Sequence, residues 1–385
     1  MQVNDGKRMV GVGLLIIYVL FCILWVIPKF SQQHEKSNTE PCILQIWHID
    51  TAEGGSISRA SWLKRIISAY EHNNKSTYVH ISTLTYEQAL LKVQNKESFD
   101  LLSFGVGVGR SFLDYIVELD VNTVAKGVRR ELIEGGTVLN KLYAVAYMMG
   151  GYCLFTRQSS VQHLLPSDMT ATSNRVNLIE VLTYNYAHDK KSKNVSCVTG
   201  YGKCNLPLTC LSLNTAHKLT SDNFVLLDNA ISQYDAYAHF IDNDGTMLLG
   251  TQRDIYKLEN RLSSGSVSAL VYQPLKHFTD LVQYMAISAQ TMYMDKCISL
   301  LQYLVSPSTQ MLIDQAYMLS VLNIPVYVDG YMAQLQEALS TEITTINAFC
   351  DIEILFKQRQ DDISSLQKAS KNNLDIFLPM LWLGD

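Results

Sequence analysis

The sequence predicts an α/β fold in two lobes, preceded by one membrane-spanning helix. A chain of 385 residues exceeds what one hydrophobic core usually holds. Strand and helix patterns alternate along most of the chain, which is typical of sheets covered by helices. The composition, 48% apolar and 17% charged, is that of a globular protein. A net charge of −5, with no stripe of lysine and arginine, argues against nucleic-acid binding.

The N-terminal segment predicts a membrane anchor. Met9 to Ile27 are nineteen residues without a charge, which is long enough for a helix to cross a bilayer. Lys7 and Arg8 precede them and favour a cytoplasmic N-terminus with the bulk of the chain extracellular. No small-residue cleavage site follows. We therefore expect an uncleaved signal anchor, a single-pass protein of the cell membrane, and a polar linker over residues 28–41.

Alternation of strands and helices with short loops predicts the first lobe. Trp62, Ile66 and Tyr70 have the spacing of one helix face, and the β-branched stretch TYVHISTL has that of a strand. A largely parallel sheet is expected from such connections. The expected elements are strands at 42–49, 77–84 and 99–104, and helices at 58–72, 86–94 and 124–133.

Residues 141–158 predict a passage from one lobe to the other, because two apolar runs without helical period flank Gly150 and Gly151. Beyond a polar region the alternation resumes, and Ser308 is expected to cap a late helix. The chain after Gly330 is expected to be mostly helical. The expected later elements are helices at 229–241, 251–261, 294–304 and 308–315, and strands at 246–250, 267–272 and 283–288.

Candidate ligand contacts lie at strand ends, because open α/β sheets bind ligands at the carboxyl ends of their strands. Aromatic residues there suit a sugar, while Arg59 and Arg110 offer charge for an anion. The first strand supplies Trp47, His48, Asp50, Glu53, Gly54 and Gly55. The third strand supplies Phe104, Gly105 and Gly107, and later segments supply Tyr147, Met149 and Tyr272.

Other readings of these residues are less favoured. The stretch FGVGVG lacks the spacing of a dinucleotide loop, since its third glycine is Gly109, one residue early. The spacing of Asp50 and Glu53 does not exclude a catalytic acid–base pair. In the alternative reading, Ser56 or Ser58 caps a helix and both acids face solvent. No third metal ligand accompanies His48, and no nucleophile motif is present. We expect neither an enzyme, nor a metal, nor a cofactor.

Seven cysteines lie outside the apolar segment, an odd number that cannot pair completely. Cys197, Cys204 and Cys210 are near enough in sequence for a local disulfide, whereas a zinc site would need a Cys-x-x-Cys pair that is absent. Cys153 and Cys297 stand in apolar runs and are expected to be buried free thiols.

Several stretches, taken in order, resemble the maltose-binding-like extracellular solute-binding proteins of ABC importers (family 1). They are ILQIWH with the helix after it, FDLLSFGVG, LYAVAYMMGGYCLF and LLQYLVSPSTQMLIDQAYMLSVLN. Ala146 stands where the family commonly has proline. The family usually has a cleaved leader or a lipid-modified cysteine, whereas this chain lacks a lipobox.

The resemblance implies a two-lobed, periplasmic-binding-protein-like (type II) fold with an interlobe cleft. Lobe I would comprise residues 42–150 and 281–325, and lobe II residues 151–280 and 326–385. The implied function is capture of a small solute, a carbohydrate first of all, and its delivery to ABC permease subunits. A membrane anchor also suits a ligand sensor of the same fold that signals to a membrane partner. A surface hydrolase using Asp50 and Glu53 is the third hypothesis.

Overall fold

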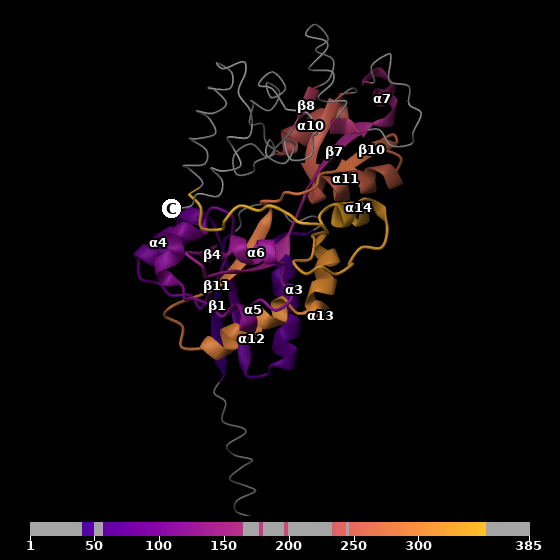
Figure 1. Cartoon of the computed structure of the whole chain (residues 1–385). Helices are drawn as coiled ribbons and strands as arrows, with labels where there is room; N and C mark the ends of the chain where they lie inside the picture. The colour runs from indigo at the N-terminus through magenta and orange to yellow at the C-terminus, as the bar shows by residue number, and fades with distance from the viewer. Residues whose placement is uncertain are drawn as a thin grey trace, which may run out of the picture.

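The computed structural model describes residues 41–49, 57–164, 177–179, 196–198, 233–243 and 246–351, which form two lobes with one main β-sheet each (Figure 1). The predicted anchor at 9–27 and the linker lie outside the described residues, as do Cys204 and Cys210. None of the described helices combines the length and the apolar character needed to cross a bilayer.

The first lobe is built on a five-stranded sheet in the order β2-β1-β3-β11-β6. The predicted strands at 42–49 and 77–84 are confirmed residue for residue. β1 runs parallel to β2 and β3, but β11 is antiparallel to β3 and β6, because it enters the sheet from the other lobe. The sheet is therefore mixed rather than largely parallel. Its strands are β1 (Cys42–Ile49), β2 (Thr77–Leu84), β3 (Leu101–Gly105), β6 (Val145–Met149) and β11 (Val282–Ile287).

The helices that pack against this sheet include α3 (Arg59–Asn73), α4 (Tyr86–Gln94), α6 (Arg130–Gly135) and α12 (Met294–Leu304). α3 buries the apolar face seen in the sequence. It begins after Ser58, whose side chain accepts a hydrogen bond from the Ser61 amide, so Ser58 is the helix cap.

Two helix predictions were wrong in detail. The region 124–133 forms two short helices, α5 (Val121–Val124) and α6 (Arg130–Gly135), because Gly127 between them has a φ of +83°. The region 308–315 divides into α13 (Pro307–Gln310) and the 3₁₀ helix η4 (Met311–Ala316). Ser306 rather than Ser308 caps α13, since its side chain accepts the Thr309 amide and proline occupies the first helical position.

The second lobe is built on a four-stranded sheet in the order β10-β7-β9-β8. β7 is antiparallel to β10 and β9, and β8 is parallel to β9. The strands are β7 (Tyr152–Arg157), β8 (Ser196–Val198), β9 (Thr246–Thr251) and β10 (Leu270–Pro274). The described helices of this lobe are α7 (Gln158–Leu164), α10 (Gln233–Asp242), α11 (Gln252–Ser263) and α14 (Gly330–Ala338), the last packed on β10 and α11.

Four described segments connect the lobes. Residues 150–151 join β6 to β7, and residues 275–281 join β10 to β11. Residues 320–329 lead to α14, and residues 339–345 lead back to the first lobe, where Phe349 packs on Phe104 with ring centroids 5.7 Å apart. The described part of the range 326–385 thus contributes to both lobes.

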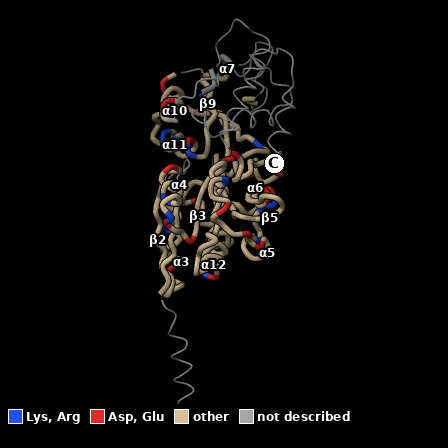
Figure 2. Tube along the Cα trace, turned by 90° about the vertical axis from the view of Figure 1, so that its left-hand side faces the viewer, with Lys and Arg blue, Asp and Glu red and all other residues tan. Residues whose placement is uncertain are grey.

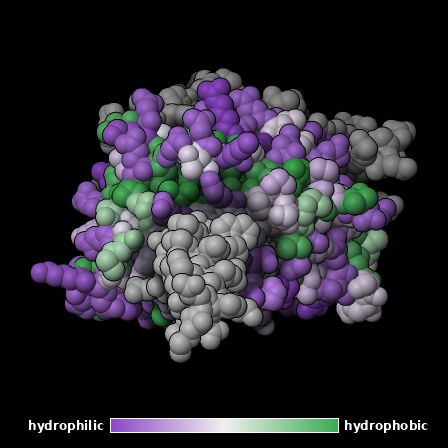
Figure 3. Space-filling view, turned by 90° about the horizontal axis from the view of Figure 1, so that it is seen from below, coloured by the Kyte–Doolittle hydropathy of each residue, from purple (hydrophilic) through white to green (hydrophobic). Residues whose placement is uncertain are grey.

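Charged residues are interspersed over the described surface. Figure 2 shows lysine and arginine alternating with aspartate and glutamate along both lobes, without a continuous basic stripe among the described residues. Figure 3 shows the lower face of the molecule, where hydrophobic residues lie among hydrophilic ones.

Candidate functional site

A cluster of buried polar side chains lies at the carboxyl ends of β1 and β3. Its members, called here the first-lobe cluster, are His48, Arg59, Ser103, Tyr147 and Gln283, all buried. They come from β1, the first turn of α3, β3, β6 and β11. Five elements therefore converge at the strand edge where ligands of open α/β sheets bind.

Ser103 is the centre of this cluster. Its Oγ lies 2.9 Å from His48 Nδ1 and 2.9 Å from the Tyr147 hydroxyl, and it accepts a 2.9 Å hydrogen bond from Gln283 Nε2. Arg59 Nη1 donates to Gln283 Oε1 over 2.7 Å, which fixes the orientation of that amide. A serine hydroxyl has one proton and two acceptor sites. Gln283 fills one acceptor site, so His48 Nδ1 and Tyr147 share the other site and the proton.

The cluster ends on a nitrogen without a partner. His48 Nε2 is buried and has no hydrogen bond to any described residue, and an unpaired buried nitrogen costs free energy. Burial, with smaller contributions from the charges of Arg59 and Lys64, lowers the pKa of His48 to about 4. The ring is therefore neutral at physiological pH, and Nε2 is a neutral polar group available to a hydroxyl or carbonyl.

The structure separates the predicted first-strand residues. His48 and Tyr147 meet in the cluster, and Tyr147 also stacks on Trp62 with centroids 6.2 Å apart. Trp47 points to the core instead, 5.0 Å from the Phe99 ring. Asp50, Glu53, Gly54 and Gly55 lie outside the described residues, so their predicted role stays a prediction.

The glycines at the end of β3 and just after it pair with other parts of the protein's own backbone. Gly107 has a φ of +80°, and the amides of Gly107 and Gly109 both donate to the carbonyl of Ala348, over 3.1 and 3.0 Å. Gly105 pairs with Gln283 across the sheet. Phe104 is buried between Tyr284 and Phe349. These glycines therefore join β3 to the C-terminal part of the described chain.

Met149 lies at the junction of the lobes, whereas Tyr272 lies within the second lobe. Met149 exchanges backbone hydrogen bonds with Leu319, beside the first crossing segment. The Tyr272 ring lies 4.8 Å from Tyr331 and 5.3 Å from Phe155, and burial raises its pKa well above the ordinary value. Arg110 is exposed in the 3₁₀ helix η2 (Gly109–Tyr115) and has no part in the first-lobe cluster.

Sequence reasoning missed Ser103 and Gln283 in the first-lobe cluster, and Gln252 beside the crossing segment 150–151. Ser103 and Gln283 are single polar residues in the apolar strands LLSFG and VQYMAI, and that isolation is the signal that was present. Gln252 opens α11, accepts the Gly151 amide over 3.0 Å, and lies 3.3 Å from Met318 Sδ. It links the second lobe to the first crossing segment.

Two cysteines of the described chain are not activated as nucleophiles. Burial raises the pKa of Cys297 and of Cys350 to about 12, so both thiols are protonated and poorly nucleophilic. Within the described ranges no three metal-binding side chains come together. Neutral donors and acceptors, with a guanidinium beside them, can hold a polar solute by hydrogen bonds.

Known structures share this architecture. The sugar-binding protein MalE from Xanthomonas citri has a TM-score of 0.60 at 12% identity, over 88% of this chain and 95% of that one. A cyclo/maltodextrin-binding protein complexed with maltotetraose has 0.59 at 11%, over 87% and 94%. Thiaminase I from Bacillus thiaminolyticus has 0.56 at 12%, over 84% and 99%.

The chain has the fold of the maltose-binding proteins. The resemblance seen in the sequence is confirmed at the level of the fold. No family model matches the sequence, and no curated protein matches it either.

Proposed function

We propose that this chain is an extracellular receptor that captures a small solute, a carbohydrate first of all, between its two lobes. The observation that carries the proposal is the first-lobe cluster, which gathers five buried polar side chains at the strand edge and leaves His48 Nε2 without a partner. The hydroxyl groups of sugars both donate and accept hydrogen bonds, so a sugar hydroxyl can pair with the neutral His48 Nε2. The similar structures that are described as sugar-binding proteins support the same substrate class.

Capture would couple to closure. A solute that touches both lobes binds the closed arrangement better than the open one, and so shifts the population toward it. Moving a ratio from 1:99 to 99:1 takes about 5.5 kcal/mol of differential affinity. A few hydrogen bonds and one stacked aromatic ring supply an energy of that order.

We further propose that the loaded receptor delivers its solute to ABC permease subunits while the segment 9–27 keeps it at the membrane. A tether raises the local concentration of the receptor beside its partner. A ligand sensor of the same fold would share the binding step and differ only in that partner. Genes for permease subunits next to the gene for this chain would favour transport over sensing.

An enzyme is the competing class, and the likeness to thiaminase I gives it a specific basis. For such a hydrolase, Asp50 and Glu53 are the acid–base pair that the sequence leaves open. Turnover of a glycoside by the exported part, abolished in Asp50→Asn, would replace the receptor proposal.

Thermal unfolding of residues 28–385 with candidate solutes tests the proposal. We expect maltotriose or another neutral oligosaccharide to raise Tm, since a ligand at 100 times its Kd stabilises by about 2.7 kcal/mol. Polyols, phosphate esters and thiamine serve as comparison solutes. Tyr147→Phe removes one hydroxyl from the cluster and should reduce the shift, whereas Tyr78→Phe removes an exposed hydroxyl on β2 and should not. No response to any neutral sugar would contradict the proposal.

A further inference from the structure

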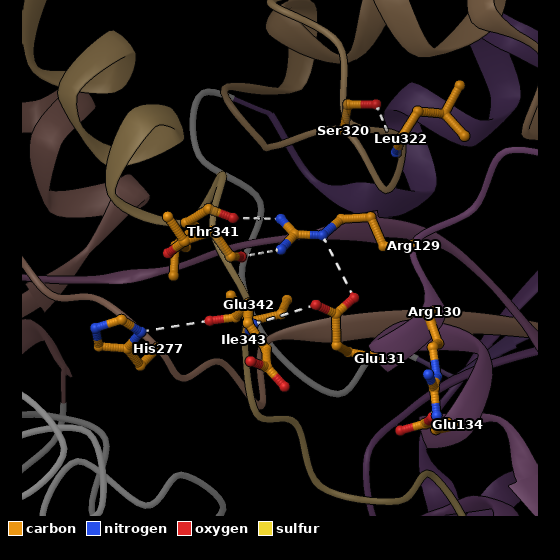
Figure 4. Close-up of polar contacts among 11 residues, drawn as sticks. Arg129, Arg130, Glu131, Glu134, His277, Ser320, Leu322, Thr341, Glu342 and Ile343 are labelled. Atoms are coloured by element: carbon orange, nitrogen blue, oxygen red, sulfur yellow. Dashed lines mark hydrogen bonds and ion pairs between the residues drawn. The ribbon is translucent and has the colours of Figure 1, made fainter.

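Residues 339–345, called here the return strap, run from the second lobe back to the first and are held by Arg129 (Figure 4). Arg129 precedes α6 in the first lobe. Its guanidinium donates one hydrogen bond to the Leu339 carbonyl and another, of 2.5 Å, to the Thr341 carbonyl. Hydrogen bonds from a charged donor are among the stronger ones in proteins.

Glu131, in the first turn of α6, contacts both Arg129 and the return strap. Its Oε2 lies 3.8 Å from Arg129 Nε, and its Oε1 accepts the Ile343 amide over 3.4 Å. Burial lowers the pKa of Arg129, and the Glu131 carboxylate opposes that effect. The Arg129 side chain is only 8% exposed, so solvent screens its interactions little.

The other side of the return strap is fixed to the crossing segment 275–281. The Thr344 amide donates to the His277 carbonyl over 2.7 Å, and the Thr279 amide donates to the Thr344 carbonyl over 3.0 Å. His277 Nδ1 lies 3.4 Å from the Glu342 carbonyl. The strap is therefore bonded to the first lobe on one side and to a hinge segment on the other.

The strap starts where the second lobe ends. α14 packs on β10 and α11, and Tyr331 in α14 contacts Tyr272. Leu339, the next residue after α14, is already bonded to Arg129. A rotation of the second lobe away from the first would move α14 and strain the hydrogen bonds between Arg129 and the return strap. A cavity of about 20 Å³ lies beside Arg129 and is also lined by Met149, Ser320, Gln336 and Ser340.

We infer that Arg129 is a positioning residue that limits how far the two lobes open, by tying the return strap to the first lobe. The return strap is a further connection that restrains movement of the lobes, in addition to the crossings at 150–151, 275–281 and 320–329. The inference does not depend on which solute binds, so it can fail or hold separately from the proposed function.

The neighbouring arginine provides a matched control. Arg130 has the same charge, but its side chain is 89% exposed and forms an ion pair with Glu134 on the surface of α6. We compare Arg129→Gln with Arg130→Gln in the full-length chain without solute. In Arg129→Gln the amides of Ile343 and Thr344 should exchange with deuterium at least about tenfold faster, and the radius of gyration from X-ray scattering should rise. Arg130→Gln should change neither, and Arg129→Lys should be intermediate because lysine lacks the planar fork.

Two readouts separate positioning from general loss of structure. Exchange of the amides of β3 and β11 should stay slow in Arg129→Gln, since the first sheet is not part of the strap. If Arg129→Gln fails to fold, Glu131→Gln decides, because it should speed exchange at Ile343 while leaving β3 protected. An unchanged radius of gyration, a strap that stays protected, or equal effects of the two arginine variants would overturn the inference.

Discussion

At the scale of single residues, His48 shows how a buried polar group constrains the protein. Its Nδ1 is bonded to Ser103, and its Nε2 has no partner among the described residues, so protonation would place a charge beside Arg59 in a buried site. The ring therefore stays neutral in the folded state, while in the unfolded chain it titrates near 6.5. This difference links stability to pH.

The sign of the linkage follows from the lowered pKa. Above about pH 6.5 the ring is neutral in both states, and no stability is lost. As the pH falls from 6.5 through about 4, the unfolded state takes up the proton first, so His48 costs about 3 kcal/mol by pH 4. Urea unfolding at pH 7, 5.5 and 4 should show a steeper loss in the natural protein than in His48→Gln. His80→Gln, an exposed histidine on β2, should follow the natural protein, and parallel curves for all three would refute the assignment.

At the scale of elements, the segment after β3 shows what its glycines do. An added Cβ at Gly109 would lie 2.6 Å from the Phe104 ring and 2.7 Å from the Phe349 ring. The glycine is thus required where β3 and the C-terminal part of the described chain approach each other. The FGVGVG pattern belongs to a joint inside the protein rather than to a phosphate loop.

Gly109→Ala should destabilise the protein by about 1–3 kcal/mol, the usual cost of overpacking a core. Phe349→Leu creates room for the added methyl group. We therefore expect the double variant Gly109→Ala, Phe349→Leu to lose less stability than the sum of the two single variants. Chemical unfolding of the four proteins measures this coupling, and strictly additive losses would show that the two residues do not meet.

The elements also show what a sequence can predict. Strands 42–49 and 77–84 and helix 294–304 are confirmed to the residue, because alternation and helical spacing are local signals. The break between α5 and α6 lies at Gly127, whose φ is positive, and the next residue, Val128, forms a β-bridge with Leu322, far along the chain. Apolar spacing does not report such a contact.

The candidate site was predicted in part for the same reason. His48 was selected at the end of a predicted strand, and Tyr147 in the predicted passage between the lobes, residues 141–158. Ser103 and Gln283 were missed because they matter only through each other, 180 residues apart in sequence and 2.9 Å apart in space. Trp47 was expected in the site, but its side chain points to the core face of β1 beside Phe99.

At the scale of the whole molecule, the topology makes the first lobe depend on a late strand. β3 and β6 are not neighbours, and β11 pairs antiparallel with both of them. Met149 and Val282 are register partners, so the chain leaves and re-enters the first sheet at adjacent positions. Everything between them, including the second sheet, is inserted into the first lobe. The five-stranded sheet is therefore complete only when residues 282–287 have joined it.

A truncation tests this dependence. A chain of residues 41–281 keeps four of the five strands but lacks β11 and with it Gln283, so β6 has no partner and Arg59 loses its acceptor. We expect it to aggregate, because both β3 and β6 would then expose an unpaired apolar edge. Residues 41–351, which carry the same N-terminal deletion and retain β11, should give a cooperative thermal transition by circular dichroism. A cooperative transition and monomeric behaviour of 41–281 would show instead that the first lobe folds without the strand that joins β3 to β6.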